Sequence, residues 1–142
     1  MSFLIDVNVW VALAVGEHVH HAAAEEWLDQ VTTERIAFCR VVQMGLLRLL
    51  TNPHVMGKDI CSAASAWAVL DSFAADSRVV FAVEPDGLVQ AWRETARDTH
   101  SGVNFWTDAY LAAFAAAAGY TLVTFDRGFT RYKDIKLELL RG

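Results

Sequence analysis

The chain has 142 residues, of which 54% are hydrophobic, and it carries a net charge of -5 at pH 7. This length and composition predict a single globular domain over residues 1–142, with enough apolar side chains for a sizeable core. The acidic balance excludes binding of nucleic acid by bulk positive charge alone. Because we find no basic leader and no apolar run of bilayer length, we expect a cytoplasmic protein without membrane contact.

Strand and helix patterns alternate along the chain. In chain order they are a strand at residues 3–6, helices at 8–15 and 20–31, a strand at 35–39, helices at 42–50 and 59–75, a strand at 78–83, helices at 88–98 and 108–118, and strands at 122–125 and 135–140. Residues 52–58, 99–103 and 127–133 are expected to be irregular. The alternation predicts an α/β protein with three α/β/α layers, in which helices flank a central, mainly parallel sheet.

Two of the predicted strands stop on an aspartate, and a third aspartate lies near the start of a helix. Asp6 ends the first strand, Asp126 follows the strand at 122–125, and Asp108 opens an alanine-rich helix. The carboxyl ends of parallel strands form the ligand crevice of an open α/β sheet. We therefore expect the three carboxylates to meet in one site, although each residue also has a purely structural interpretation, as a loop start or a helix-dipole partner.

A cluster of carboxylates needs a physical reason to exist. Two such charges 4 Å apart repel by about 4 kcal/mol at an effective dielectric constant near 20, and a bound cation relieves that repulsion. Oxygen ligands favour Mg²⁺ or Mn²⁺ over Zn²⁺. These ions suit the hydrolysis of phosphodiesters because they polarise phosphoryl oxygens and activate a water.

Four blocks of the chain resemble the PIN-domain family. Residues 4–13 resemble the opening of a PIN domain, residues 46–53 its second block, and residues 106–113 and 122–129 its third and fourth, in the family order and at family-like spacing. The resemblance is to bacterial VapC-type toxins. It implies an Mg²⁺- or Mn²⁺-dependent endoribonuclease that cleaves RNA and is neutralised by a small cognate antitoxin, whose segment wraps over the active site. The high share of apolar residues in the chain further predicts a homodimer.

The resemblance also implies roles for individual residues. Asp6 matches the first metal-ligating acid, Asp108 the third and Asp126 the fourth, whereas Gln43 stands where most relatives have a glutamate. An amide oxygen can ligate a metal or orient its water, but it carries no charge. Gln43 is then either a tolerated variant or a cause of attenuated catalysis. In the second case the protein is an RNA- or protein-binding module with a PIN fold.

Several polar side chains near these blocks are candidates for contact with the substrate. They are Asn8, Arg40, Asn104, Thr124, Arg127 and Arg131. The arginines are suited to hold RNA phosphates bidentately. The asparagines either line the cleft or cap helices, and the threonine either binds a water or fills the sheet. Trp10 and Trp106 are expected to line the same cleft or to contact the antitoxin.

Overall fold

A five-stranded parallel sheet forms the middle of the part of the chain that the structure describes, residues 1–98 and 102–142. In this computed structural model the strand order is β3-β2-β1-β4-β5, and every neighbouring pair is parallel. The strands are β1 (Ser2–Ile5), β2 (Arg35–Phe38), β3 (Val79–Phe81), β4 (Thr121–Thr124) and β5 (Lys136–Leu139). The prediction of a parallel sheet is confirmed, and each expected strand is present with its ends shifted by at most two residues.

The first strand occupies the centre of this sheet because its side chains are apolar on both faces. Leu4 and Ile5 are fully buried. Leu4 pairs with Ala37 of β2 on one side and with Leu122 of β4 on the other. Two segments from opposite ends of the sequence therefore finish side by side, and the residues that follow them share one edge of the sheet.

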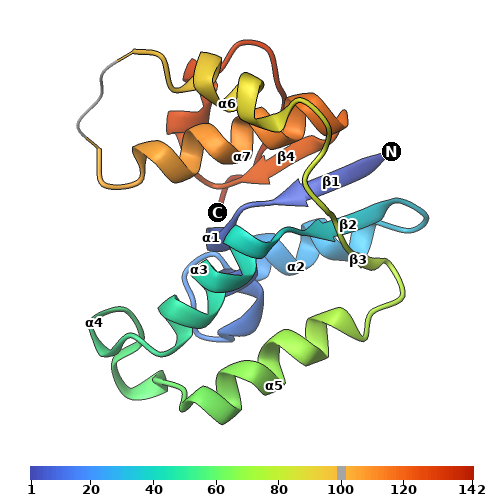
Figure 1. Ribbon diagram of the computed structural model, residues 1–142. Coiled ribbons are helices and arrows are strands. Elements are labelled where there is room, and N and C mark those ends of the chain that lie inside the picture. Colours follow the sequence, from blue (N-terminus) through green and yellow to red (C-terminus); the bar gives the residue numbers. More distant parts are fainter. Residues whose placement is uncertain (99–101) are drawn as a thin grey trace.

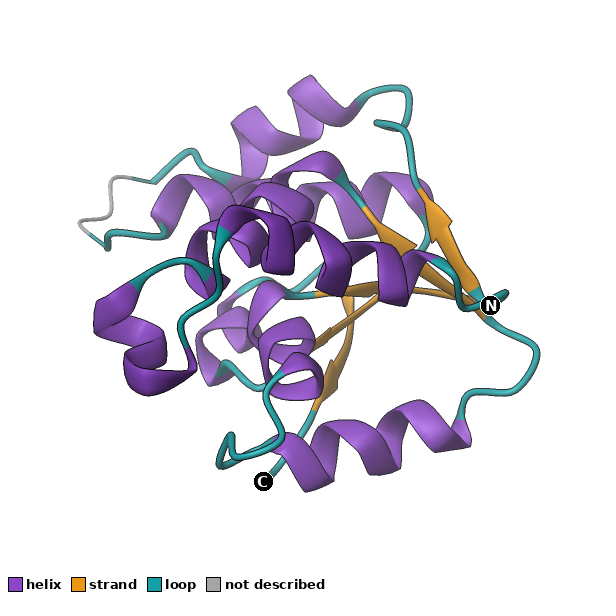
Figure 2. Ribbon diagram, turned by 90° about the horizontal axis from the view of Figure 1, so that it is seen from below, coloured by secondary structure: helices purple, strands orange, loops and turns teal. Residues whose placement is uncertain are grey.

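Helices cover both faces of the sheet (Figure 1). On one face lie α1 (Val7–Ala14), α2 (His21–Gln30), α3 (Arg40–Leu50) and α5 (Ala63–Ala74), and on the other lie α6 (Leu88–Thr95) and α7 (Phe105–Ala118). Figure 2 shows the strands set at different angles to one another, which is the twist expected of a parallel sheet. The three-layer prediction is confirmed. Among the described residues, no helix is long and apolar enough to span a membrane.

The segment after α3 differs from its prediction. The helix expected at 59–75 begins four residues later, at α5, because Ser62 caps it by accepting a hydrogen bond from the backbone N–H of Ser65 at 3.1 Å. The stretch expected to be irregular at 52–58 contains the one-turn helix α4 (Pro53–Met56). Asn52 caps α4 in the same way, so in both places a short polar side chain set the helix start. Of the stretch expected to be irregular at 99–103, residues 99–101 lie outside the described residues.

The indole of Trp10 belongs to the core rather than to a cleft. It is 1% exposed and stacks on Phe38 with ring centroids 4.0 Å apart. The expectation that it lines the site is wrong, because the face of α1 that carries it packs against the sheet. Trp106, by contrast, is 63% exposed.

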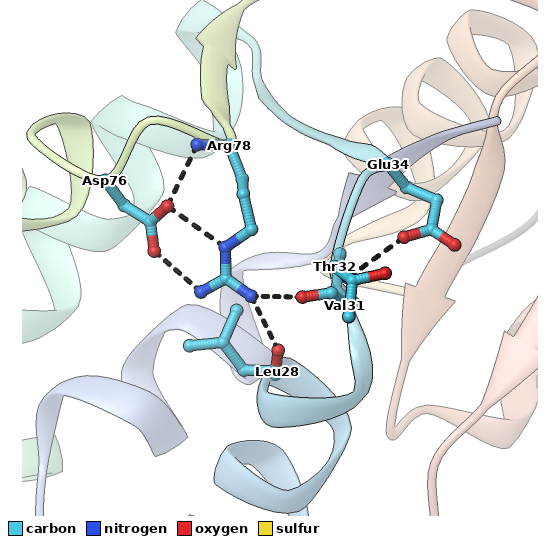
Figure 3. A network of polar contacts seen from close by, with 6 residues as sticks. All are labelled: Leu28, Val31, Thr32, Glu34, Asp76 and Arg78. Atoms are coloured by element: carbon cyan, nitrogen blue, oxygen red, sulfur yellow. Dashed lines mark hydrogen bonds and ion pairs between the residues drawn. The ribbon is translucent and has the colours of Figure 1, made fainter.

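The guanidinium of Arg78 joins the start of β3 to the end of α2, far from the carboxyl ends of the strands (Figure 3). It donates hydrogen bonds to the backbone carbonyls of Leu28 at 2.8 Å and Val31 at 2.5 Å. It also forms an ion pair with Asp76 at 2.7 Å, which lowers the pKa of that carboxyl. Arg78 thus donates to two carbonyls at the end of α2, where the carbonyl of Leu28 also accepts from the N–H of Val31.

Replacing Arg78 by Met is expected to lower the free energy of unfolding by about 2 to 3 kcal/mol, because charge-assisted hydrogen bonds to partly buried carbonyls are lost. Urea unfolding followed by tryptophan fluorescence measures the change. Arg48→Met, at an exposed position on α3, is the matched control and should change stability by less than about 0.5 kcal/mol. Equal stability of the two variants would show that the Arg78 contacts contribute nothing.

Candidate functional site

The carboxylate of Asp6 is held at the junction of β1 and α1. Its Oδ1 accepts a hydrogen bond from the N–H of Val7 at 2.7 Å, which caps α1, and its Oδ2 accepts one from the hydroxyl of Thr124 at 2.8 Å. The side chain is only 6% exposed. Burial raises the pKa of Asp6, while the two hydrogen bonds oppose that rise. Because the groups that donate to this buried carboxylate are neutral, a nearby cation would stabilise its ionised form.

The hydroxyl of Thr124 connects the ends of β1 and β4. Thr124 is fully buried and donates to Asp6, and its oxygen accepts from the backbone N–H of Asp126 at 3.0 Å. The side-chain amide of Asn8 also approaches that oxygen, at 3.4 Å. Thr124 therefore does more than fill the sheet, because one hydroxyl fixes the positions of two segments that carry acids.

Asp126 opens the turn that follows β4. Its Oδ1 accepts a hydrogen bond from the N–H of Gly128 at 2.8 Å and caps the short 3-10 helix η2 (Arg127–Arg131). Residues 127–133, predicted to be irregular, therefore contain ordered structure. The turn brings Arg131 near the acids, where its charge acts on Asp108 and its guanidinium lies 4.8 Å from the ring centre of Tyr132.

Asp108 lies in the first turn of α7, on the opposite face of the sheet from α1. Burial, the largest cause, and the negative charges of Asp6 and Asp126 together raise the pKa of Asp108 to about 6, while the charge of Arg131 opposes them. The three aspartates predicted to meet thus act on one another electrostatically, although they come from three different elements. A raised pKa in such a cluster is typical of functional sites.

The donor chemistry of this cluster suits a hard divalent cation, since every acidic donor is a carboxylate oxygen. Within the described residues, no three acidic, histidine or cysteine side chains stand close enough to enclose an ion by themselves. Mg²⁺ commonly keeps several waters and takes only one or two carboxylates together with substrate phosphates. The arrangement therefore fits an ion held by water and phosphate as well as by these acids.

Replacing Asp108 by Asn should stabilise the metal-free protein at neutral pH. Folding raises the pKa of Asp108 to about 6. Above that pH the ionised carboxylate destabilises the folded state. Below the ordinary pKa of aspartate the group is protonated in both states and has no effect on stability. Allowing for solvent screening, we expect a gain of about 1 to 2 kcal/mol at pH 7.5. The gain should shrink as the pH falls from 6 to 4. Thermal unfolding in EDTA at several pH values measures it, and a pH-independent difference would contradict this explanation.

Gln43 and Arg40 lie together in the first turns of α3. A guanidinium nitrogen of Arg40 donates to the Oε1 of Gln43 at 2.7 Å, and the guanidinium carbon lies 4.7 Å from the ring centre of Phe81. The amide oxygen considered as a metal ligand is thus engaged by an arginine. Nothing in the sequence pattern indicated that Phe81 contacts Arg40, because Phe81 lies on β3 and is distant from α3 in the sequence.

The remaining predicted contacts are spread around this edge of the sheet. Asn8 does not cap α1, which Asp6 caps, and its Oδ1 instead accepts from the backbone N–H of Phe125 at 3.4 Å. Asn104 stands at the N-terminal end of α7 without a side-chain capping bond and is exposed. Arg127 is exposed at the start of η2. Asn8 therefore bonds to the residues at the end of β4, whereas Asn104 and Arg127 are exposed.

Comparisons with known proteins identify a family and several similar proteins. The sequence profile described as "PIN domain" matches residues 3–135. Ribonuclease VapC41 of Mycobacterium tuberculosis is 46% identical over 142 residues, which covers 96% of this chain and 97% of that protein, and Ribonuclease VapC29 of the same species is 39% identical over 128 residues, covering 90% of this chain and 88% of that protein.

Two solved structures share the fold. VapBC2 from Rickettsia felis, bound to a DNA fragment from its promoter, has a TM-score of 0.71 at 20% identity and covers 99% of this chain and 100% of that chain. VapC20 of M. tuberculosis, described as a sarcin-ricin loop cleaving toxin, has a TM-score of 0.70 at 18% identity and covers 94% of this chain and 97% of that chain. At these identities the likeness concerns the fold alone.

Proposed function

The chain belongs to the PIN domain family, and from that premise we propose that it is an endoribonuclease and the toxin component of a toxin–antitoxin pair. One observation carries the proposal. Asp6, Asp108 and Asp126, from three separate elements, act on one another at the carboxyl edge of the sheet. They do so in a chain that is 46% identical to a ribonuclease across nearly its whole length.

The proposed cofactor is Mg²⁺, with Mn²⁺ as the other ion suited to carboxylate ligands. Asp6, Asp108 and Asp126 are the residues that would hold it. When bound, the ion would polarise the phosphoryl oxygens of the RNA and make water a better nucleophile. The raised pKa values of Asp6 and Asp108 support this assignment, because a cation offsets the cost of keeping both groups ionised.

Other residues at the carboxyl edge of the sheet are proposed to position the acids and the RNA strand. Thr124 and the N–H of Val7 fix the two oxygens of Asp6, so that this carboxylate has little rotational freedom. Arg131 lies near Asp108 and presents an exposed guanidinium for a phosphate of the RNA strand. Arg127 lies exposed in the same turn and is proposed to bind the strand further out.

The proposal extends to partners. Solved structures with this fold include VapBC proteins, and we propose that a small antitoxin of the VapB kind covers the acidic edge. We further propose that residues 1–142 form one PIN domain that assembles as a homodimer. A cytoplasmic location, where RNA substrates are available, stays a prediction.

The test is RNA cleavage by the purified chain, free of any antitoxin. We expect cleavage of single-stranded or loop-containing RNA with Mg²⁺ or Mn²⁺, none in EDTA, and recovery when the ion is restored. The alternative of a catalytically attenuated module predicts RNA binding without cleavage under every one of these conditions. The absence of both cleavage and binding on varied RNAs would contradict the proposed function.

A further inference from the structure

The orientation of the Gln43 amide follows from its contact with Arg40. A guanidinium has only N–H donors, so the atom 2.7 Å from it must be the amide oxygen. The amide nitrogen, with its two N–H groups, is therefore turned away from Arg40. Gln43 thus has two N–H donors available to whatever approaches this turn of α3, while one lone pair of its oxygen is occupied by Arg40.

Arg40 is held in place yet keeps its charge available. The face of its guanidinium lies over the ring of Phe81, 4.7 Å from the ring centre, in a cation–π contact. The side chain is otherwise exposed, and in the described part of the chain no carboxylate forms an ion pair with it. A fixed, unneutralised guanidinium is the side chain best suited to bind a phosphate.

The turn that carries these two residues lies at the same edge of the sheet as Asp6, because α3 begins directly after β2, which pairs in parallel with β1. A Cβ on Gly45 would come within 3.3 Å of the Val7 side chain, so α3 packs tightly against the start of α1. Val7 is also the residue whose N–H binds Asp6. The donors of α3 therefore flank a cluster of three negative charges, which on its own would repel the backbone of an RNA strand.

We propose that Arg40 and Gln43 form a phosphate-binding pair for the RNA strand, and that Gln43 is a substrate-positioning residue rather than a metal ligand. This inference rests on the proposed function. The guanidinium and the amide N–H groups would donate to the non-bridging oxygens of a phosphodiester next to the one that is cleaved. A carboxylate at position 43 would instead pair with Arg40 and remove both donors from the strand.

The test separates effects on KM from effects on kcat. Arg40→Met and Gln43→Met remove the donors and keep side-chain bulk, and each is expected to raise the KM for a single-stranded RNA about ten-fold with kcat changed less than about two-fold. Arg40→Met should also reduce the slope of log KM against log salt by about 0.7. The Mg²⁺ concentration for half-maximal rate should not change. Arg48→Met, on the exposed far end of the same helix, is the control and should match wild type.

Gln43→Glu gives the sharpest comparison. Since the new carboxylate would form an ion pair with Arg40, we expect KM to rise at least as much as in Gln43→Met, at an unchanged Mg²⁺ requirement. A several-fold lower Mg²⁺ requirement in Gln43→Glu would overturn the inference, and so would a KM in Arg40→Met equal to that of Arg48→Met. Either result leaves the ribonuclease assignment standing. A wild-type protein that neither binds nor cleaves RNA would overturn both.

Discussion

Replacing Asp108 by Asn is expected to lower the rate of metal-dependent RNA cleavage by more than about a hundred-fold, because groups that only orient a metal ligand already account for ten- to a hundred-fold. Asp108 is the acid on which the charges of both Asp6 and Asp126 act. The asparagine keeps the shape and removes the charge that would bind the ion. Initial rates at saturating RNA, measured over a range of Mg²⁺ concentrations, give the effect.

The same variant carries its own folding control. Asp108→Asn should unfold at a higher temperature than wild type in EDTA at neutral pH, so loss of activity cannot be ascribed to misfolding. Asp71→Asn makes the same chemical change at an exposed position on α5, and should leave the rate unchanged. Activity of Asp108→Asn within ten-fold of wild type would contradict the assignment of Asp108 to the site.

Replacing Thr124 by Val is expected to reduce cleavage by about ten- to a hundred-fold, as is typical for a residue that orients a metal ligand. The valine removes the hydrogen bond that the fully buried Thr124 donates to Asp6, and it leaves the N–H of Asp126 without this acceptor. We therefore also expect a loss of about 1 to 3 kcal/mol in the free energy of unfolding. Cleavage kinetics and urea unfolding measure the two effects.

The direction of the pH dependence provides a further check on Thr124. Its hydrogen bond lowers the pKa of Asp6, so Thr124→Val should raise that pKa and impair activity more at pH 6 than at pH 8. Thr124→Ser retains the hydroxyl and should recover most of the activity. Thr121→Val, at the other end of the same strand, is the matched control. Equal activity of the two valine variants would contradict a positioning role for Thr124.

The order and type of the helices and strands follow from local sequence patterns, because hydrophobic periodicity and capping residues encode them. Largely apolar runs such as 3–5 and 122–125 predict strands buried on both faces, and the strands found there, β1 and β4, are neighbours in the sheet. An acid after each run predicts a shared edge, since parallel strands end together. The later start of α5 was missed because the capping effect of Ser62 outweighed the helical pattern that precedes it.

The partners of the individual polar groups at that edge depend on how the chain packs in three dimensions. The hydroxyl of Thr124 reaches Asp6 across two strands that are distant in the sequence, and Arg40 rests on Phe81 of another strand while it binds the Gln43 oxygen. Hydrogen bonds and ring contacts depend on distances of a few ångströms between side chains, and these distances are set by how strands and helices pack. Sequence periodicity specifies which face a residue occupies, but the partner it meets there comes from elsewhere in the chain.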